Sequence, residues 1–171
     1  MSITIRRLAP IDALDYVTLR REMLADSPWS FLASPEQDRG CDLEKVRASL
    51  AREDAAIFAV REGDRLVAAA GVVRDEALKK RHIATIWGVY VAPGARGRGL
   101  GRAVVCAAMD AARSWPGVGS IHLAVSSNAP LARRLYDSLG FREWGYEPDA
   151  VRINGVSYGE HHMAMALDKQ P

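Results

Sequence analysis

The most informative segment of the sequence is Ile86-Trp87-Gly88-Val89-Tyr90-Val91-Ala92-Pro93-Gly94-Ala95-Arg96-Gly97-Arg98-Gly99-Leu100-Gly101. An apolar strand pattern leads into a glycine-rich turn and then into a helical pattern. Glycine has no Cβ, so such a turn can lay its backbone N–H groups against a phosphate. The helix start adds unpaired N–H donors and partial positive charge. With the cationic side chains of Arg96, Arg98 and Arg102, the segment predicts a cradle for a diphosphate.

Two other phosphate-binding loops are excluded by single residues. A Walker A loop would continue from Gly99 with Lys-Ser or Lys-Thr, but Leu100-Gly101 follows. A dinucleotide fingerprint that starts at Gly97 needs glycine or alanine at position 102, which is an arginine. Two other interpretations stay open: a tight strand-to-helix connection with solvated arginines, and a phosphate-ligand or RNA-binding segment. The strongly periodic helix that follows argues against a disordered RNA binder.

The elements on either side follow from apolar periodicity and turn residues. The first helix carries Ala13, Leu14, Val17 and Leu24 on its apolar face, and Gly140 is placed to cap the last one. Because strands and helices alternate in the second half, we expect an α/β (α+β) domain with a mixed sheet. Strands are expected around Ile3 and Ile5, at 56–61, 66–73, 84–91 and 121–125, and on both sides of Asn154-Gly155; helices are expected at 12–25, 43–52, 97–114 and about 132–139.

Composition indicates an ordinary globular protein. With 171 residues, 49% hydrophobic and 26% charged, the chain suits one domain over 1–171. A net charge of +2 is too small to indicate nucleic acid or an anionic membrane as a partner. Cys41 and Cys106 form no CxxC pair, so no metal site is expected. The amino terminus lacks the apolar stretch of a signal peptide, and no apolar run approaches the roughly 20 residues of a membrane span, so we expect a cytoplasmic protein.

Two motifs together resemble a known family. Arg96-x-x-Gly99-x-Gly101, after an apolar strand and a proline, is similar to the acetyl-CoA signature Gln/Arg-x-x-Gly-x-Gly/Ala of GNAT N-acetyltransferases. Asn128…Ala132-x-x-Leu135-Tyr136-x-x-x-Gly140-Phe141 is similar to the family's second conserved stretch, and the order of elements matches over nearly the whole chain. The resemblance implies a mixed, mostly antiparallel sheet of about seven strands flanked by about four helices. It also implies acetyl-CoA as co-substrate and direct attack by a primary amine in a ternary complex.

The resemblance assigns the cofactor contacts. The strand ending at Val91 would pair with the pantetheine arm through the backbone of Val89, Tyr90 and Val91. The loop amides would hold the pyrophosphate; they belong to Arg96, Gly97, Arg98, Gly99, Leu100, Gly101 and Arg102. Asn128 would contact the cofactor near its acyl end, although it lies eight residues before Tyr136 where the family spacing is seven. The alternative for Asn128 is a helix N-cap.

The resemblance also assigns one catalytic residue and leaves a gap. Tyr136 would be the general acid that protonates the departing CoA thiolate; its alternative is a core tyrosine. Many relatives carry a glutamate base where this chain has Trp87, which cannot accept a proton. An alkylamine of pKa about 10.4 is mostly protonated at neutral pH, so a substitute is needed. A water chain along the strand could serve, an acceptor of low pKa would need no base, and the candidate side chains are His82, His122, Glu160, His161 and His162.

The acceptor is not specified. In this family its site is formed mainly by the first two helices and the last hairpin, where aromatic residues can line a pocket or close the core. A small-molecule amine, an amino acid and a protein amine all stay open, as do an acyl group larger than acetyl and a homodimer. Trp87 also supports a different class, a non-catalytic acyl-CoA-binding sensor or interaction module. The aromatic residues are Trp29, Phe31, Trp144, Tyr146 and Tyr158.

Overall fold

The computed structural model describes residues 4–167 and contains, in that range, one sheet of seven strands in the order β1-β2-β3-β4-β5-β7-β6. Neighbouring strands are antiparallel except β4 and β5, which are parallel. The expected mixed, mostly antiparallel sheet is therefore confirmed. The strands are β1 (Ile5–Arg7), β2 (Ala55–Glu62), β3 (Arg65–Arg74), β4 (Ile83–Val91), β5 (Ser120–Ser126), β6 (Arg142–Ile153) and β7 (Val156–Ala166).

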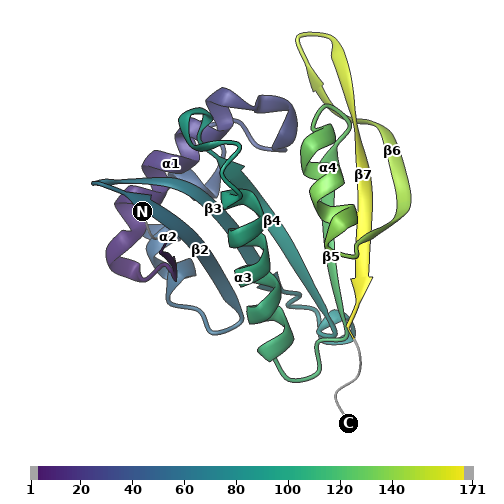
Figure 1. Cartoon of the computed structure of the whole chain (residues 1–171), viewed down its shortest axis with the longest axis horizontal. Helices are drawn as coiled ribbons and strands as arrows, with labels where there is room; N and C mark the ends of the chain where they lie inside the picture. The colour runs from purple at the N-terminus through teal and green to yellow at the C-terminus, as the bar shows by residue number, and fades with distance from the viewer. Residues whose placement is uncertain (1–3, 168–171) are drawn as a thin grey trace.

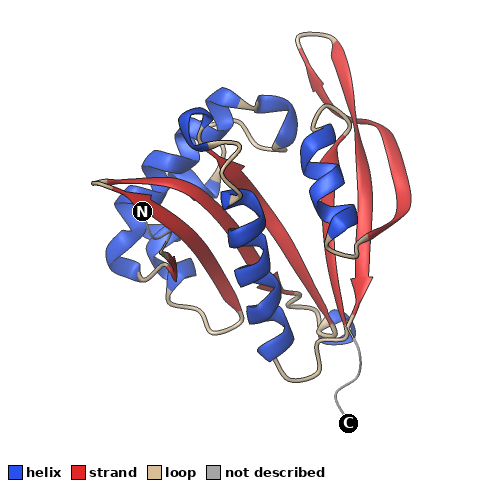
Figure 2. Ribbon diagram, viewed as in Figure 1, coloured by secondary structure: helices blue, strands red, loops and turns tan. Residues whose placement is uncertain are grey.

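Four α-helices in the described range cover both faces of this sheet (Figures 1 and 2). One face carries α3, which packs on β2, β3 and β4, and α4, which packs on β5. The opposite face carries α1 and α2, which contact β3 and β2. Five short 3-10 helices lie in the connections. The α-helices are α1 (Ala13–Asp26), α2 (Leu43–Leu50), α3 (Leu100–Ser114) and α4 (Pro130–Ser138).

Two expectations about these elements need correction, and a third falls on a residue outside the described range. α3 begins at Leu100 and not at 97, because Gly97 and Gly99 have φ of +75° and +77°, outside the helical region. In α1, Leu14 is 64% exposed, and the core face is centred on Tyr16, Met23 and their neighbours. Ile3, expected in the first strand, lies outside the described residues.

The turn chemistry of the second half is confirmed. Asn154 and Gly155 have φ of +49° and +81°, as a type I′ turn between β6 and β7 requires. Gly140 has φ of +98° just after α4, where a left-handed residue was expected. None of the helices in residues 4–167 is long and apolar enough to cross a membrane.

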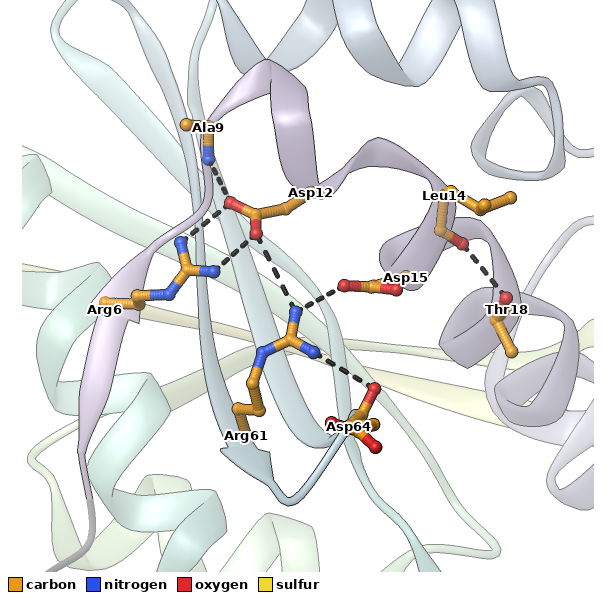
Figure 3. Close-up of polar contacts among 8 residues, drawn as sticks. All are labelled: Arg6, Ala9, Asp12, Leu14, Asp15, Thr18, Arg61 and Asp64. Atoms are coloured by element: carbon orange, nitrogen blue, oxygen red, sulfur yellow. Dashed lines mark hydrogen bonds and ion pairs between the residues drawn. The ribbon is translucent and has the colours of Figure 1, made fainter.

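An ion-pair network anchors the start of α1 to the sheet (Figure 3). Asp12, only 5% exposed, accepts from the Arg6 guanidinium at 2.7 Å and from the Ala9 N–H at 2.9 Å. Arg61 of β2 pairs with Asp15 and lies 3.8 Å from Asp12. The hydrogen bond from Arg6 holds the pKa of Asp12 below its usual range, so the carboxylate stays charged. This network fixes α1 beside β2.

The two parallel strands, β4 and β5, are paired at one end and diverge toward the other (Figure 1). β4 pairs with β5 only from Ile83–Thr85 to Ser120–His122. Further along, β4 has a β-bulge: two of its residues, Gly88 and Val89, lie opposite a single residue of β3. Gly88 adopts φ of +60° there. The bulge turns β4 away from β5, and the gap between the two strands positions the site.

Candidate functional site

The gap between β4 and β5 holds a cavity of about 70 Å³ that is bordered from both faces of the sheet. Ala132 and Tyr136 of α4 lie on one side, and Ser30 and Phe31, which follow α1, lie on the other. The cavity therefore joins the α3/α4 face to the α1/α2 face. The remaining lining residues are Ile86, Trp87, Gly88, Val89, Leu123, Ala124, Val125, Ser126 and Ala129.

The glycine turn before α3 leaves its backbone open. A Cβ built on Gly94, Gly97 or Gly99 would meet no atom within 4 Å. Gly99 is the N-cap of α3, and no side chain caps this helix. The N–H groups of the first turn, from Leu100 on, are thus available to an anion. This geometry fits the pyrophosphate that the sequence predicts for this turn.

The three arginines of the turn are exposed and already have partners. Arg96 pairs with Asp26 of α1 at 2.5 Å and donates to the Val91 carbonyl at 3.0 Å. Arg98 pairs with Glu62 at 2.5 Å, and its hydrogen bond holds the pKa of Glu62 below its usual range. Arg102 donates to Ser138 Oγ at 2.6 Å. A phosphate bound here would compete with one hydroxyl and two carboxylates for these guanidinium groups.

The backbone of β4 is unpaired with β5 along the gap, and among the described residues only its Val91 carbonyl, which accepts from Arg96, has a partner there. Tyr90 and Val91 pair with Ala69 and Ala68 of β3, but past Thr85 no ladder within residues 4–167 joins the other edge of β4 to β5. The Tyr90 ring points to α1, where its hydroxyl lies 3.5 Å from Glu22 Oε1 and burial raises its pKa. It is therefore the backbone from Val89 to Val91 that can pair with an extended ligand.

Tyr136 is both a core residue and a lining residue. Its side chain is 4% exposed, its ring lies edge-on to Phe141 with centroids 6.0 Å apart, and it borders the cavity. Burial raises the pKa of its hydroxyl. The phenol therefore keeps its proton throughout the neutral range, as a proton donor must.

Asn128 is exposed and lies outside the cavity lining. The N-cap of α4 is Ala129, without a side-chain cap, so the interpretation of Asn128 as N-cap is wrong. The helix starts one residue late because Pro130 takes its first position. The Asn128 N–H donates to Ser126 Oγ at 3.2 Å, which leaves the Asn128 side chain free to contact a ligand.

The candidate bases divide between different parts of the molecule. His82 is exposed just before β4, and its carbonyl accepts from the Gly119 N–H, at the closed end of the gap. His161 faces α4: its Nε2 lies 3.1 Å from Arg133 and its Nδ1 lies 3.0 Å from Glu143. Neither borders the cavity.

The other three candidates share a sheet face with Trp87. Trp87 faces α1 and α2, because it borders a groove of about 910 Å³ together with Tyr16 and Val46. Two residues earlier, Thr85 pairs with His122, and every second residue along β5 has the same orientation. Ala124 and Ser126 pair with His162 and Glu160 of β7. The side chains of His122, Glu160 and His162 therefore lie on the α1/α2 face.

One acidic neighbour of this group was missed in the sequence. Glu147 of β6 pairs with Glu160, and ligand atoms of Glu147, Glu160 and His162 all lie within 4.8 Å of one another. An isolated glutamate between two bulges carries no pattern, because the bulges break the alternation of β6 that would assign it to a face.

The aromatic candidates lie around the same face and the hairpin. Phe31 borders the cavity beneath the Arg20 guanidinium, which is 4.9 Å from the ring centroid. Trp29 stacks on Tyr158 at 6.4 Å. Trp144 and Tyr146 are 64% and 50% exposed, so the core interpretation is wrong for these two. Trp144 leans on His162, with ring centroids 5.4 Å apart, and Tyr146 on His161 at 4.7 Å.

The chain matches a family model and curated relatives that are named as acetyltransferases. The model of the acetyltransferase (GNAT) family matches residues 18–141. Over 84 residues the chain is 39% identical to streptothricin acetyltransferase of Streptomyces lavendulae, a match covering 48% of this chain and 43% of the relative. The chain spans less than half the length of the curated relatives it matches.

Two solved structures show the fold over almost the whole chain. A GCN5-related N-acetyltransferase from Kribbella flavida is 26% identical, with a TM-score of 0.79 over 96% of this chain and 98% of that one. A putative acetyltransferase from Salmonella typhimurium, determined with its cofactor acetyl-CoA, is 20% identical, with a TM-score of 0.85 over 100% of this chain and 97% of that one.

Proposed function

The chain belongs to the acetyltransferase (GNAT) family, and we propose that it transfers an acetyl group from acetyl-CoA to a primary amine. The observation that carries the proposal is the continuity of three features. The open glycine turn before α3 leads along the free edge of β4 to the cavity at the β4–β5 gap. An anionic head, an extended arm and a reactive end would fit these three features in that order.

The residues act mainly by positioning. Backbone N–H groups from Arg96 to Arg102 would hold the pyrophosphate, with Arg96, Arg98 and Arg102 exchanging their present partners for phosphate oxygens. The backbone of Val89, Tyr90 and Val91 would align the pantetheine arm as an added strand. Asn128 would contact the arm near its acyl end. Bound acetyl-CoA supplies an activated thioester, and its acyl carbon belongs in the cavity.

The cavity joins two faces of the sheet, and this suits direct attack in a ternary complex. The acceptor amine would approach from the α1/α2 face, where Phe31 and Trp87 border the cavity. Tyr136 lies on the opposite side with its proton retained, ready to protonate the departing sulfur. Orientation of two bound reactants is itself a large part of such catalysis.

A second candidate function rests on Trp87. Since an indole occupies the usual position of the base, the domain could bind acyl-CoA without turning it over, as a sensor or interaction module. Turnover distinguishes the two functions. A small-molecule or protein amine as acceptor, a cytoplasmic location, a homodimer and one domain over 1–171 stay predictions.

The first test is thermal unfolding with and without acetyl-CoA, with ATP and NAD as controls. A ligand at a hundred times its Kd adds about 2.7 kcal/mol of stability. At roughly 2–4 °C per kcal/mol, the midpoint should rise by about 5–10 °C with acetyl-CoA alone. No rise, or an equal rise with ATP, would contradict the cofactor assignment.

Turnover is then measured by thiol release with a panel of spermidine, an aminoglycoside, free amino acids and short peptides with a free amino terminus. Steady release with one class of amine supports the transferase and identifies the acceptor class. Stabilisation by acetyl-CoA without release by any amine would favour the binding module.

A further inference from the structure

Glu160 lies at the level of the cavity. Ser126 of β5 borders the cavity together with Val89 of β4, and Ser126 pairs with Glu160 of β7. Paired residues on antiparallel strands have Cβ atoms about 4.5–5.5 Å apart and lie on the same face. Because Ser126 and Val89 border the cavity, Glu160 is next to it on the α1/α2 face.

The Glu160 carboxylate has no partner among the described residues. Its side chain is only 9% exposed, yet none of the hydrogen bonds or ion pairs within residues 4–167 includes it. Burial raises its pKa, and the nearby Glu147 adds to this effect while His162 opposes it. The Glu160 oxygen atoms still reach solvent, so a cationic ligand on this face can supply the partner that a carboxylate in such a place normally has.

The two histidines on this face are less well placed. His122 is level with Thr85, where the strands are still paired, and its Nε2 lies 3.2 Å from Ser120 Oγ. His162 pairs with Ala124, which also borders the cavity, but its Nε2 already lies 3.5 Å from Glu147 Oε2. Of the three, Glu160 alone pairs with a residue that borders the cavity and has no hydrogen-bond or ion-pair partner within residues 4–167.

We propose that Glu160 is the general base of this enzyme and that, with Glu147, it receives the acceptor as a cationic primary ammonium. The inference rests on the proposed transferase function and supplies the proton acceptor that Trp87 cannot be. Trp144, which leans on His162, adds an exposed aromatic ring beside the histidine of this cluster, and such a ring also attracts an ammonium group.

Protons move from the acceptor amine to Glu160 and from Tyr136 to the leaving thiolate. The ammonium nitrogen gives one proton to Glu160 Oε, and its freed lone pair forms the bond to the acyl carbon. The carbon–sulfur bond breaks, and the sulfur takes a proton from Tyr136. The new amide nitrogen loses its surplus proton to solvent, and Glu160 and Tyr136 then return to their starting forms by exchange with water.

The test is Glu160→Gln, which keeps the shape and removes the proton acceptor. The matched control is Glu143→Gln, the same change on the neighbouring strand, where the carboxylate faces α4 and pairs with His161 and Arg133. We expect kcat of Glu160→Gln to fall by about 10²–10⁴-fold, while Glu143→Gln stays near wild type. Stabilisation by acetyl-CoA should be the same in all three proteins.

The pH profile separates a base from a structural residue. Wild-type kcat should level off above the raised pKa of Glu160, with the charges of Glu147, His162 and His122 facing it. For Glu160→Gln, kcat should instead rise by about tenfold per pH unit up to the pKa of the amine. Its defect should also be smaller with a peptide amino terminus, pKa about 7.7–8.0, than with an alkylamine of about 10.4.

The outcomes distinguish this inference from the proposed function. Wild-type turnover with an equally active Glu160→Gln of unchanged pH profile would overturn the base and leave the transferase intact. A wild type that binds acetyl-CoA but releases no thiol with any amine of the panel would overturn both. If Glu160→Gln does not fold, Glu160→Asp takes its place, and its profile must keep the wild-type plateau.

Discussion

Gly71 and Trp87 face each other across β3 and β4, and the indole lies directly over the glycine. A Cβ on Gly71 would stand 2.4 Å from Cε2 and 2.6 Å from Cζ2 of Trp87. No such contact is tolerated, so the absence of a side chain at Gly71 is what allows the indole to lie flat on the α1/α2 face. The pair thus sets the wall of the cavity on the side from which we expect the acceptor to approach.

Gly71→Ala should therefore destabilise the protein through its contact with Trp87. Overpacking of this kind costs about 1–3 kcal/mol. In a Trp87→Ala background the same change should cost far less, which gives a coupling of at least about 1 kcal/mol in a double-mutant cycle. Urea unfolding of the four proteins measures it. If the two changes in unfolding free energy simply add, the cost of an alanine at position 71 does not come from contact with Trp87.

Gly99→Ala should weaken acetyl-CoA binding, and Gly94→Ala should not. Both positions have open space around a new Cβ, but only Gly99 has a positive φ, +77°. An alanine there costs roughly 1–2 kcal/mol, and 1.4 kcal/mol is about tenfold in Kd if the bound loop needs this conformation. The measurement is Kd by calorimetry for both variants. Equal Kd values for the two variants would mean that the positive φ of Gly99 does not contribute to acetyl-CoA binding.

The fold was predictable from local chemistry. Asn154-Gly155 fixed the last hairpin, and the alternation of strands and helices fixed the mixed sheet, because both signals are local. The predicted start of α3 was wrong. The helical periodicity extends back to residue 97, but the positive φ of Gly97 and Gly99 delays the helix until Leu100.

The site was predictable only in part. The turn that should hold the phosphates is contiguous, so its residues appear together in the sequence. The base candidates were five side chains with nothing to rank them, because only the strand register shows that His161 faces α4 while Glu160 is level with the cavity. The contact between Trp87 and Gly71 could not be predicted, because the two residues lie on different strands and only the strand register brings them together.

Tyr16→Phe should stabilise the protein. The Tyr16 hydroxyl is the one buried side-chain polar atom within residues 4–167 that lacks a hydrogen-bond partner, and burial raises its pKa. Removing an unsatisfied group of this kind recovers about 1 kcal/mol or more, so the midpoint of thermal unfolding should rise by about 2–4 °C. Tyr146→Phe, at a half-exposed ring, is the matched control and should change nothing. A loss of stability in Tyr16→Phe would mean that water satisfies the hydroxyl.

Tyr136→Phe should slow turnover without weakening acetyl-CoA binding, because the ring, which packs on Phe141, is kept and only the hydroxyl is lost. The loss in kcat should be at most about 10²–10⁴-fold. It is limited because a thiol of pKa about 8.5 already leaves as a fair anion. Unchanged kcat would make Tyr136 a core residue only.

The pH dependence gives this variant a second signature. The pKa of Tyr136 is raised by burial, so the folded protein keeps this proton where the unfolded chain, with a tyrosine pKa of about 10, loses it. The stability it contributes is therefore complete below pH about 10 and falls as the pH rises further. Unfolding of wild type and Tyr136→Phe, followed in urea between neutral and strongly alkaline pH, should show a smaller alkaline loss of stability in the variant. The same proton retention predicts a wild-type kcat with no decline from Tyr136 up to pH about 9, and such a decline, absent from the variant, would mean that bound acetyl-CoA lowers the pKa of the phenol.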